Sequence, residues 1–225
     1  MRHLSHLSTL LWKDLLIEMK SRETIISMFL FSLLVILIFN FAFAADAATM
    51  KKLSPGLIWI TFLFFGVLGL NRSFTLEKEN GSLQGTLLTP VDRGVIYLGK
   101  FLSNLIFVLF VEIITLPLFT LFLNVNLLQH FGDLWIILVL GSIGFISVGT
   151  LFSAIAVNTK LREVMLPILL YPVTTPAFIA AVKCTSAILR DRPVESYSNW
   201  LSILILYDVV FLVTSFLIFQ FVVEE

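Results

Sequence analysis

Charged residues are scarce in this sequence, and their scarcity excludes an ordinary soluble domain. Asp, Glu, Lys and Arg make up 13% of the 225 residues, whereas a typical soluble domain carries about 25%. Hydrophobic residues reach 58%, phenylalanine alone occurs 22 times, and the mean hydropathy is +0.99. A soluble core cannot bury that much apolar surface, so the composition predicts a protein whose solvent is lipid.

Other absences narrow the function. Cys184 is the only cysteine, so no disulfide can form within the chain, and a buried free thiol is expected. The net charge is zero, which offers no overall field for nucleic acid, and we expect no nucleic-acid partner. The sequence has no G-x-x-x-x-G-K-[ST] motif for nucleotide phosphates, so we expect a chain that is not an enzyme and leaves ATP hydrolysis to a partner. Charges at Lys13, Asp14 and Glu18 interrupt the N-terminal apolar residues, so we expect no signal peptide.

Six apolar stretches predict membrane-spanning helices. A helix needs roughly 20 mostly apolar residues to cross the hydrocarbon layer, and a backbone in lipid must form its hydrogen bonds internally. The predicted spans are residues 24–45, 57–71, 95–123, 134–157, 164–182 and 201–223, the second of them beginning after Pro55. The predicted fold is therefore all-α, with a single transmembrane domain over residues 1–225.

Residues 1–22 predict an amphipathic helix that lies in the cytoplasmic interface of the membrane. Five apolar residues recur there at steps of three and four, with the charged residues mostly elsewhere on the helical wheel: Leu4, Leu7, Leu11, Leu15 and Met19. The alternative is a poorly ordered tail.

Lys and Arg residues are distributed unevenly between the two sides of this arrangement. Ten lie in the N-terminal segment and in the loops after the second and fourth spans, and five lie in the other loops. Because basic residues favour the cytoplasmic side, this bias predicts that both termini are cytoplasmic. The last outer loop, with Lys183, Arg190 and Arg192, is itself basic.

A polar segment, residues 72–92, separates the second and third spans. Gly81 is expected to end a cytoplasmic extension of the second span. Ser82 is expected to cap a short transverse helix that runs through Leu88. The next residues have a pattern typical of a helix start, here that of the third span. Thr89 is the expected cap, Pro90 the first helical residue and Asp92 the capping-box acid.

The two edges of this segment differ in polarity. The apolar edge consists of Leu83, Leu87 and Leu88, and the charged edge of Glu77, Lys78 and Glu79. A short apolar edge beside charges suits a helix that docks into a groove of a partner protein. A loop that rests on lipid headgroups explains the same residues equally well.

Three stretches occur in order along the chain: LSPGLIWITFLFF (53–65), LNRSFTLEKENGSLQGTLLTP (70–90, with Lys100 following) and LLYPVTTPAFI (169–179). Together with the N-terminal helix and six spans, they resemble the CcmB family, the haem exporter B permeases of cytochrome c maturation, over nearly the whole chain. The resemblance implies an ABC-exporter permease in the bacterial inner membrane, in which the segment between spans two and three contacts the ATPase.

The resemblance also implies partners. They are an ATPase of the CcmA type, a haem-handling membrane protein of the CcmC type, a small subunit of the CcmD type, the haem chaperone CcmE, membrane lipid and a second copy of the chain. Haem and ATP are then handled by the complex, with no cofactor or metal held by this chain, which lacks a Trp-rich outer loop like that of CcmC. The implied ATPase-coupling residues are Glu77, Glu79, Gly81, Leu83, Leu87 and Pro90.

Glu112 in the third span and Asp208 in the sixth are acidic residues inside the predicted bundle. Intramembrane acids are functional candidates, but we expect no basic residue inside the spans to pair with them. A neutral carboxyl, hydrogen-bonded within the bundle, is therefore the favoured interpretation. Pro167, Pro172 and Pro176 are expected to kink the fifth span.

Other residues have mainly structural interpretations. Small residues in the fourth span predict close helix packing: Gly141, Gly144, Gly149 and Ser153. His130 is a candidate haem ligand, although a polar anchor is the simpler interpretation. Aromatic residues at the expected interface depth are predicted anchors: Trp135, Tyr197 and Trp200.

Three other functions fit the same residues. A permease of a generic exporter for lipids or drugs would share the architecture, and a structural membrane adaptor would share the spans without coupling to ATP. A proton-driven carrier that uses Glu112 and Asp208 is weaker, because no inverted repeat is visible in the sequence.

Overall fold

The structure is a computed structural model that describes residues 2–20, 22–43, 47–79, 81–89, 91–123, 125, 127–157, 159 and 161–222. Every regular element within these residues is helical: α1 (Arg2–Lys20), α2 (Arg22–Phe43), α3 (Ala47–Glu79), α4 (Ser82–Leu87), α5 (Arg93–Leu123), α6 (Phe131–Ala156), α7 (Arg162–Ile188) and α8 (Ser198–Val222). Two short 3-10 helices, η1 (Leu128–His130) and η2 (Val194–Ser196), precede α6 and α8.

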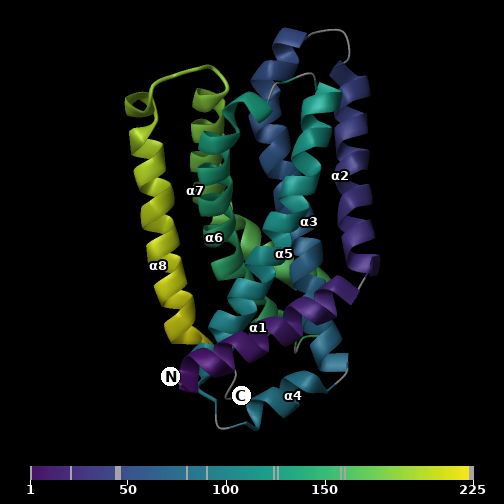
Figure 1. Cartoon of the computed structure of the whole chain (residues 1–225), viewed down its shortest axis with the longest axis vertical. Coiled ribbons are helices and arrows are strands. Elements are labelled where there is room, and N and C mark those ends of the chain that lie inside the picture. Colours follow the sequence, from purple (N-terminus) through teal and green to yellow (C-terminus); the bar gives the residue numbers. More distant parts are fainter. Residues whose placement is uncertain are drawn as a thin grey trace.

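Six of these helices are long and apolar enough to cross a membrane: α2, α3, α5, α6, α7 and α8. Figure 1 shows them side by side in a bundle, with α1 and α4 lying across one end, which we call the α1–α4 end. The last turn of α8 reaches the same end. The chain is a multi-pass membrane protein, and the predicted all-α fold with six spans and an N-terminal helix is confirmed.

α1 packs against the first turns of α5. Leu10 lies directly on Gly99, where an added Cβ would come within 3.2 Å of the leucine Cβ. On the other side of the helix, Trp12 is 65% exposed. A helix that crosses one end of a bundle with an aromatic ring facing outward suits a position in the membrane interface.

α3 begins at Ala47, ten residues before the predicted start at Leu57, and passes through Pro55 without a break. A proline inside a helix removes the hydrogen bond to the carbonyl four residues earlier, which here belongs to Lys51. The hydroxyl of Ser54 donates to that carbonyl at 3.3 Å. This replacement bond is the kind of local compensation that lets a proline remain inside a membrane helix.

α6 lies at the centre of the bundle and packs against α3, α5, α7 and α8. An added Cβ at Gly141 would come within 2.2 Å of the Trp59 ring, and one at Gly144 within 2.5 Å of the Asp208 carboxyl. The Trp59 ring is held in place because its Nε1 donates to Oγ1 of Thr185 at 2.9 Å. Small residues in α6 therefore allow the close approach of α3 and α8 that the sequence pattern indicated.

α7 is a single helix through all three of its prolines, and it ends at Ile188 rather than near residue 182. The kinks expected at Pro167, Pro172 and Pro176 stay a prediction. Cys184 lies in the last part of this helix as a buried free thiol, as expected.

Candidate functional site

α4 is set at an angle to α3 at the α1–α4 end of the bundle (Figure 1). The 33 residues of α3 span about 50 Å at roughly 1.5 Å per residue, whereas the hydrocarbon layer is about 30 Å thick. α3 is therefore about 20 Å longer than a crossing of the hydrocarbon layer needs. Gly81 then adopts a left-handed φ of 65°, and its carbonyl accepts a hydrogen bond from the Gly85 N–H in α4 at 3.2 Å. The predicted break at Gly81 and the short helix after it are confirmed.

Among the described residues, α3 is the only element with extensive contacts to α4. Leu88, which follows α4 directly, is 87% exposed. An exposed leucine beside a short helix at one end of the bundle suits contact with a protein partner or with lipid headgroups. The predictions for the side chains of Glu77, Glu79, Leu83 and Leu87, and for Pro90, lie outside the described part of the chain.

The start of α5 differs from the prediction. The helix begins at Arg93, and Oδ1 of Asp92 accepts a hydrogen bond from the Gly94 N–H at 2.7 Å. The Thr89 hydroxyl instead donates to the Thr86 carbonyl at 2.6 Å, at the end of α4. Thr89 was therefore wrongly predicted to cap the third span, because an Asp three residues later supplies a charged acceptor at the actual helix start.

Two polar contacts brace the extension of α3 against its neighbours. Nζ of Lys78 donates to the Val157 carbonyl at 2.7 Å, next to the last residue of α6. This bond satisfies one of the carbonyls that a helix end leaves unpaired. Nη2 of Arg72 lies 2.7 Å from Oε2 of Glu23 in the first turn of α2. Both partners of that second pair are substantially exposed, so it contributes little to stability.

A buried ion pair joins α1 to α5. Nζ of Lys100 lies 3.0 Å from Oδ2 of Asp14, and the two side chains are only 5% and 4% exposed. Nζ of Lys13 lies 3.0 Å from the other carboxylate oxygen of Asp14. The ammonium group of Lys100 also lies 5.7 Å from the centre of the Phe74 ring of α3. The side chain of Lys100 thus contacts both α1 and α3 from within α5.

The sequence analysis missed this pair, and it wrongly expected no basic residue inside a span. Lys100 falls within the span that covers Arg93–Leu123. A signal was available, because Asp14 follows Leu7 by seven residues and so lies on the apolar stripe of α1. An acid on the buried stripe of an amphipathic helix requires a basic partner.

Glu112 and Asp208 are both buried inside the bundle, at 1% and 5% exposure. The Ser142 hydroxyl of α6 donates to Oε1 of Glu112 at 2.7 Å. Oε2 of Glu112 and both carboxyl oxygens of Asp208 have no hydrogen-bond partner among the described residues. Nδ2 of Asn104 in α5 lies 3.5 Å from Oγ1 of Thr150 in α6. This contact and the bond between Ser142 and Glu112 share one register of the two antiparallel helices.

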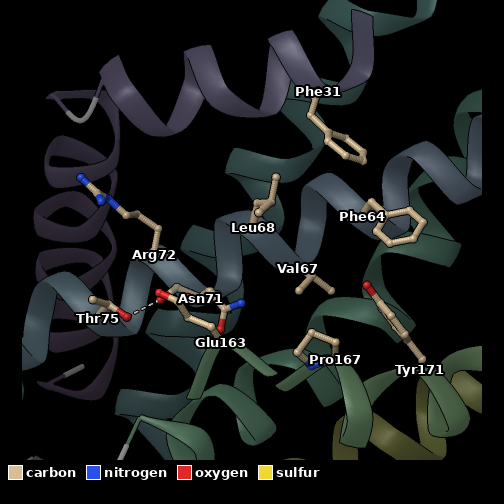
Figure 2. Close-up of a pocket in the computed structure, with 10 residues that line it drawn as sticks. All are labelled: Phe31, Phe64, Val67, Leu68, Asn71, Arg72, Thr75, Glu163, Pro167 and Tyr171. Carbon is tan, nitrogen blue, oxygen red and sulfur yellow. Dashed lines mark hydrogen bonds between the residues drawn. The ribbon is translucent and has the colours of Figure 1, made fainter. Parts of the chain in front are cut away.

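A cavity of about 600 Å³ opens between α2, α3 and α7. Figure 2 shows its polar residues gathered at one side and its aromatic rings at the other. The lining residues are Phe31, Phe64, Val67, Leu68, Asn71, Arg72, Thr75, Glu163, Pro167 and Tyr171. The volume is within the range of small-molecule sites. The separation of polar and apolar linings suits an amphipathic group rather than a free ion.

Comparison with known proteins decides the family. A family model described as CcmB protein matches residues 5–223. The chain belongs to the CcmB family. The resemblance seen in the sequence is thereby confirmed over most of the chain.

Three CcmB relatives illustrate the similarity. The chain is 27% identical over 172 residues to Heme exporter protein B of Pseudomonas aeruginosa, which covers 76% of this chain and 77% of that protein. It is 25% identical over 183 residues to Heme exporter protein B of Bradyrhizobium diazoefficiens, with coverages of 81% and 82%. It is 26% identical over 192 residues to that of Haemophilus influenzae, with coverages of 85% and 85%.

Membership in the CcmB family defines the class of protein. The chain is the membrane subunit of a cytochrome c maturation ABC exporter, and it is a transport component rather than an enzyme. In this CcmB-family chain, the exposed α4 and the braced extension of α3 lie together at the α1–α4 end, whereas Glu112 and Asp208 lie within the spans. The candidate site is therefore the α1–α4 end, not an ionisable pathway through the bundle.

Replacing Glu112 with glutamine is expected to leave assembly and cytochrome c maturation close to the wild-type level. Glutamine keeps the shape of the side chain, and its amide oxygen can still accept the bond from Ser142. The measurement is the yield of mature c-type cytochrome in cells that carry only the variant. Loss of maturation with normal membrane levels of the protein would instead indicate that Glu112 ionises or carries protons.

Proposed function

We propose that residues 72–92 transmit the motion of a partner ATPase to the spans of this CcmB-family chain. The single observation that carries the proposal is the position of α4, which packs mainly on α3, is set at an angle to it by the left-handed Gly81, and is followed by the exposed Leu88. The bond from Lys78 to Val157 supports the proposal. It joins the extension of α3 to the end of α6, so a movement of the extension would also move α6. Coupling between sites needs such a contiguous chain of contacts.

The partners follow from this role. We infer an ATPase of the CcmA type on α4, with membrane partners of the CcmC and CcmD types and the haem chaperone CcmE as client. The relatives are named as heme exporters. In the proposed division of labour, ATP is hydrolysed by the ATPase, haem is handled by the other membrane subunits, and this chain couples them in the bacterial inner membrane.

Purification of the full-length chain in mild detergent, followed by identification of its partners, tests this division of labour. We expect an ATPase and a Trp-rich haem-handling membrane protein to co-purify with the chain. Recovery of an ATPase alone would favour the generic exporter, and recovery of neither would favour the structural adaptor.

Both termini are expected to face the cytoplasm, from the ten-to-five bias of Lys and Arg residues. Support comes from the ends of the bundle, since α8 ends where α1 and α4 lie (Figure 1). A reporter that is active only outside the cytoplasm should give no signal when fused after Glu225, and a strong signal when inserted at Gln129. The reverse pattern would invert the proposed topology and place α4 out of reach of any ATPase.

A further inference from the structure

A basic cavity of about 320 Å³ lies where α7 turns into α8. Figure 1 shows this turn at the end of the bundle opposite α1 and α4. Lys183, Arg190 and Arg192 line it, together with the aromatic side chains of Tyr197 and Trp200. Among the described residues, none of the three cationic side chains forms a salt bridge. The cavity therefore carries three cations that have no ion-pair partner within the described part of the chain.

The acidic residues of the same loop are engaged elsewhere or lie outside the cavity. Asp191 has a left-handed φ of 54°, and its Oδ1 lies 3.5 Å from Nε2 of His130, the residue before α6. Glu195 is exposed and does not line the cavity. The residues that line the cavity thus include three cations and no acid, which favours an anionic ligand there.

An apolar groove of about 360 Å³ between α3 and α7 reaches the same lysine. Gly56 and Ile60 of α3 and Phe178 and Ile179 of α7 are among its lining residues, and Lys183 lines both the groove and the basic cavity. Ile179 and Lys183 are four residues apart on one face of α7, and Arg190 follows in the turn just after the helix ends at Ile188.

We propose that the basic cavity and the apolar groove together bind one anionic phospholipid. Its phosphate binds Lys183, Arg190 and Arg192, since guanidinium and ammonium groups donate well to phosphate oxygens. Its acyl chain lies in the groove between α3 and α7. Trp200 and Tyr197 mark the depth of the headgroup region, where their rings are favoured. A soluble anion would use the cavity but not the groove, so the continuity of the two through Lys183 selects an amphipathic ligand.

This site also accounts for an exception in the charge pattern. In the proposed topology, three of the five basic residues on the outer side belong to this cavity. Basic residues are otherwise depleted outside the cytoplasm. A phosphate ligand gives these three a local role that outweighs that bias.

Native mass spectrometry of the full-length protein, titrated with phosphatidylglycerol, measures the binding directly. The variant Arg190→Gln with Arg192→Gln should weaken binding by about 30-fold, at roughly fivefold per cation near a phosphate surface. The matched control, Lys51→Gln with Lys52→Gln, removes the same charge from the first turns of α3 outside both cavities and should leave binding unchanged. Phosphatidylcholine should bind the wild type more weakly than phosphatidylglycerol does. Its affinity should be the same for the two charge variants.

Filling the groove tests the acyl chain separately. An added Cβ at Gly56 meets no atom within 4 Å, so Gly56→Leu should fold normally while occupying the groove. We expect it to weaken phosphatidylglycerol binding by roughly tenfold, which corresponds to about two displaced methylene groups. Gly132→Leu, at a second glycine with open space around it, is the control and should have no effect.

Equal binding of phosphatidylglycerol to the wild type and the arginine variant would overturn the proposal. A second pair of results would overturn the proposal in favour of a free anion. In that case inorganic phosphate would bind more weakly to the arginine variant than to the wild type, and Gly56→Leu would leave lipid binding unchanged. Retention of hemin in place of phosphatidylglycerol would overturn the lipid assignment as well. If the double arginine variant does not fold, the single variant Lys183→Gln, which touches both cavities, should still give about a fivefold loss.

Discussion

Replacing both Leu83 and Leu87 with alanine is expected to separate the chain from its ATPase while leaving it inserted in the membrane. Both residues belong to the six-residue helix α4. They are part of the apolar edge that we propose docks into a groove of the ATPase. Truncating a buried leucine in such an interface commonly costs about 1–3 kcal/mol. The pair should thus weaken the interaction by roughly a hundredfold or more. The measurements are ATPase recovery with the purified chain and the yield of mature cytochrome c.

Two comparisons make this result specific to α4. Leu121→Ala with Leu128→Ala removes two exposed leucines far from the α1–α4 end and should keep the ATPase bound. Reversing the charges of Glu77 and Glu79 should weaken binding less than the leucine pair, and the effect should fade with added salt. Wild-type ATPase recovery by the double leucine variant would mean that α4 is a loop resting on lipid headgroups.

Replacing Lys100 with methionine is expected to lower the stability of the folded bundle by about 3–5 kcal/mol. The change leaves the Asp14 carboxylate buried without the ammonium group 3.0 Å away, and breaking one side of a buried pair carries a penalty of that size. The midpoint of thermal unfolding in detergent should fall by roughly 10 °C. Because the pair ties α1 to α5, protease sensitivity of α1 should rise at the same time.

The controls separate the buried charge from the loss of any lysine. Adding Asp14→Leu to Lys100→Met removes the orphaned carboxylate and should restore most of the stability, since a buried pair can be replaced by apolar residues. Arg72→Met breaks a pair with exposed Glu23 and should cost no more than about 1 kcal/mol. Equal small shifts for Lys100→Met and Arg72→Met would show that the buried pair does not hold α1 in place.

The sequence alone predicted the elements that are determined by one strong, local physical constraint. Lipid forces long apolar stretches to be helices, so the six spans were predictable. Gly81 was recognisable as the end of an extension because a left-handed turn favours glycine. The boundaries were less predictable because small local bonds decide them. The hydroxyl of Ser54 lets α3 continue through Pro55, and Asp92 caps α5 where Thr89 was expected to.

Which residues meet across distant parts of the chain could not be predicted from the sequence, even where one of them, such as Asp14, signalled that a partner was needed. The pairing of Asp14 with Lys100 exists only because α1 folds across the start of α5. The basic residues of the last outer loop contributed only to a charge count, and Trp200 was interpreted as an anchor. Their shared cavity forms only when the end of α7 meets the start of α8. The burial of Glu112 was expected from its position in an apolar span, but its partner Ser142 was not.

The docking of α4 on an ATPase can be tested most directly by crosslinking from residue 88. Leu88 is 87% exposed directly after α4, and the only native cysteine, Cys184, is fully buried. Leu88→Cys therefore introduces a single accessible thiol, and Leu121→Cys provides a matched exposed thiol remote from α4. We expect a short bifunctional reagent to join residue 88, and not residue 121, to the ATPase in membranes that contain the complex. Equal crosslinking from both positions, or none from residue 88 in a complex that retains its ATPase, would contradict the coupling role of α4.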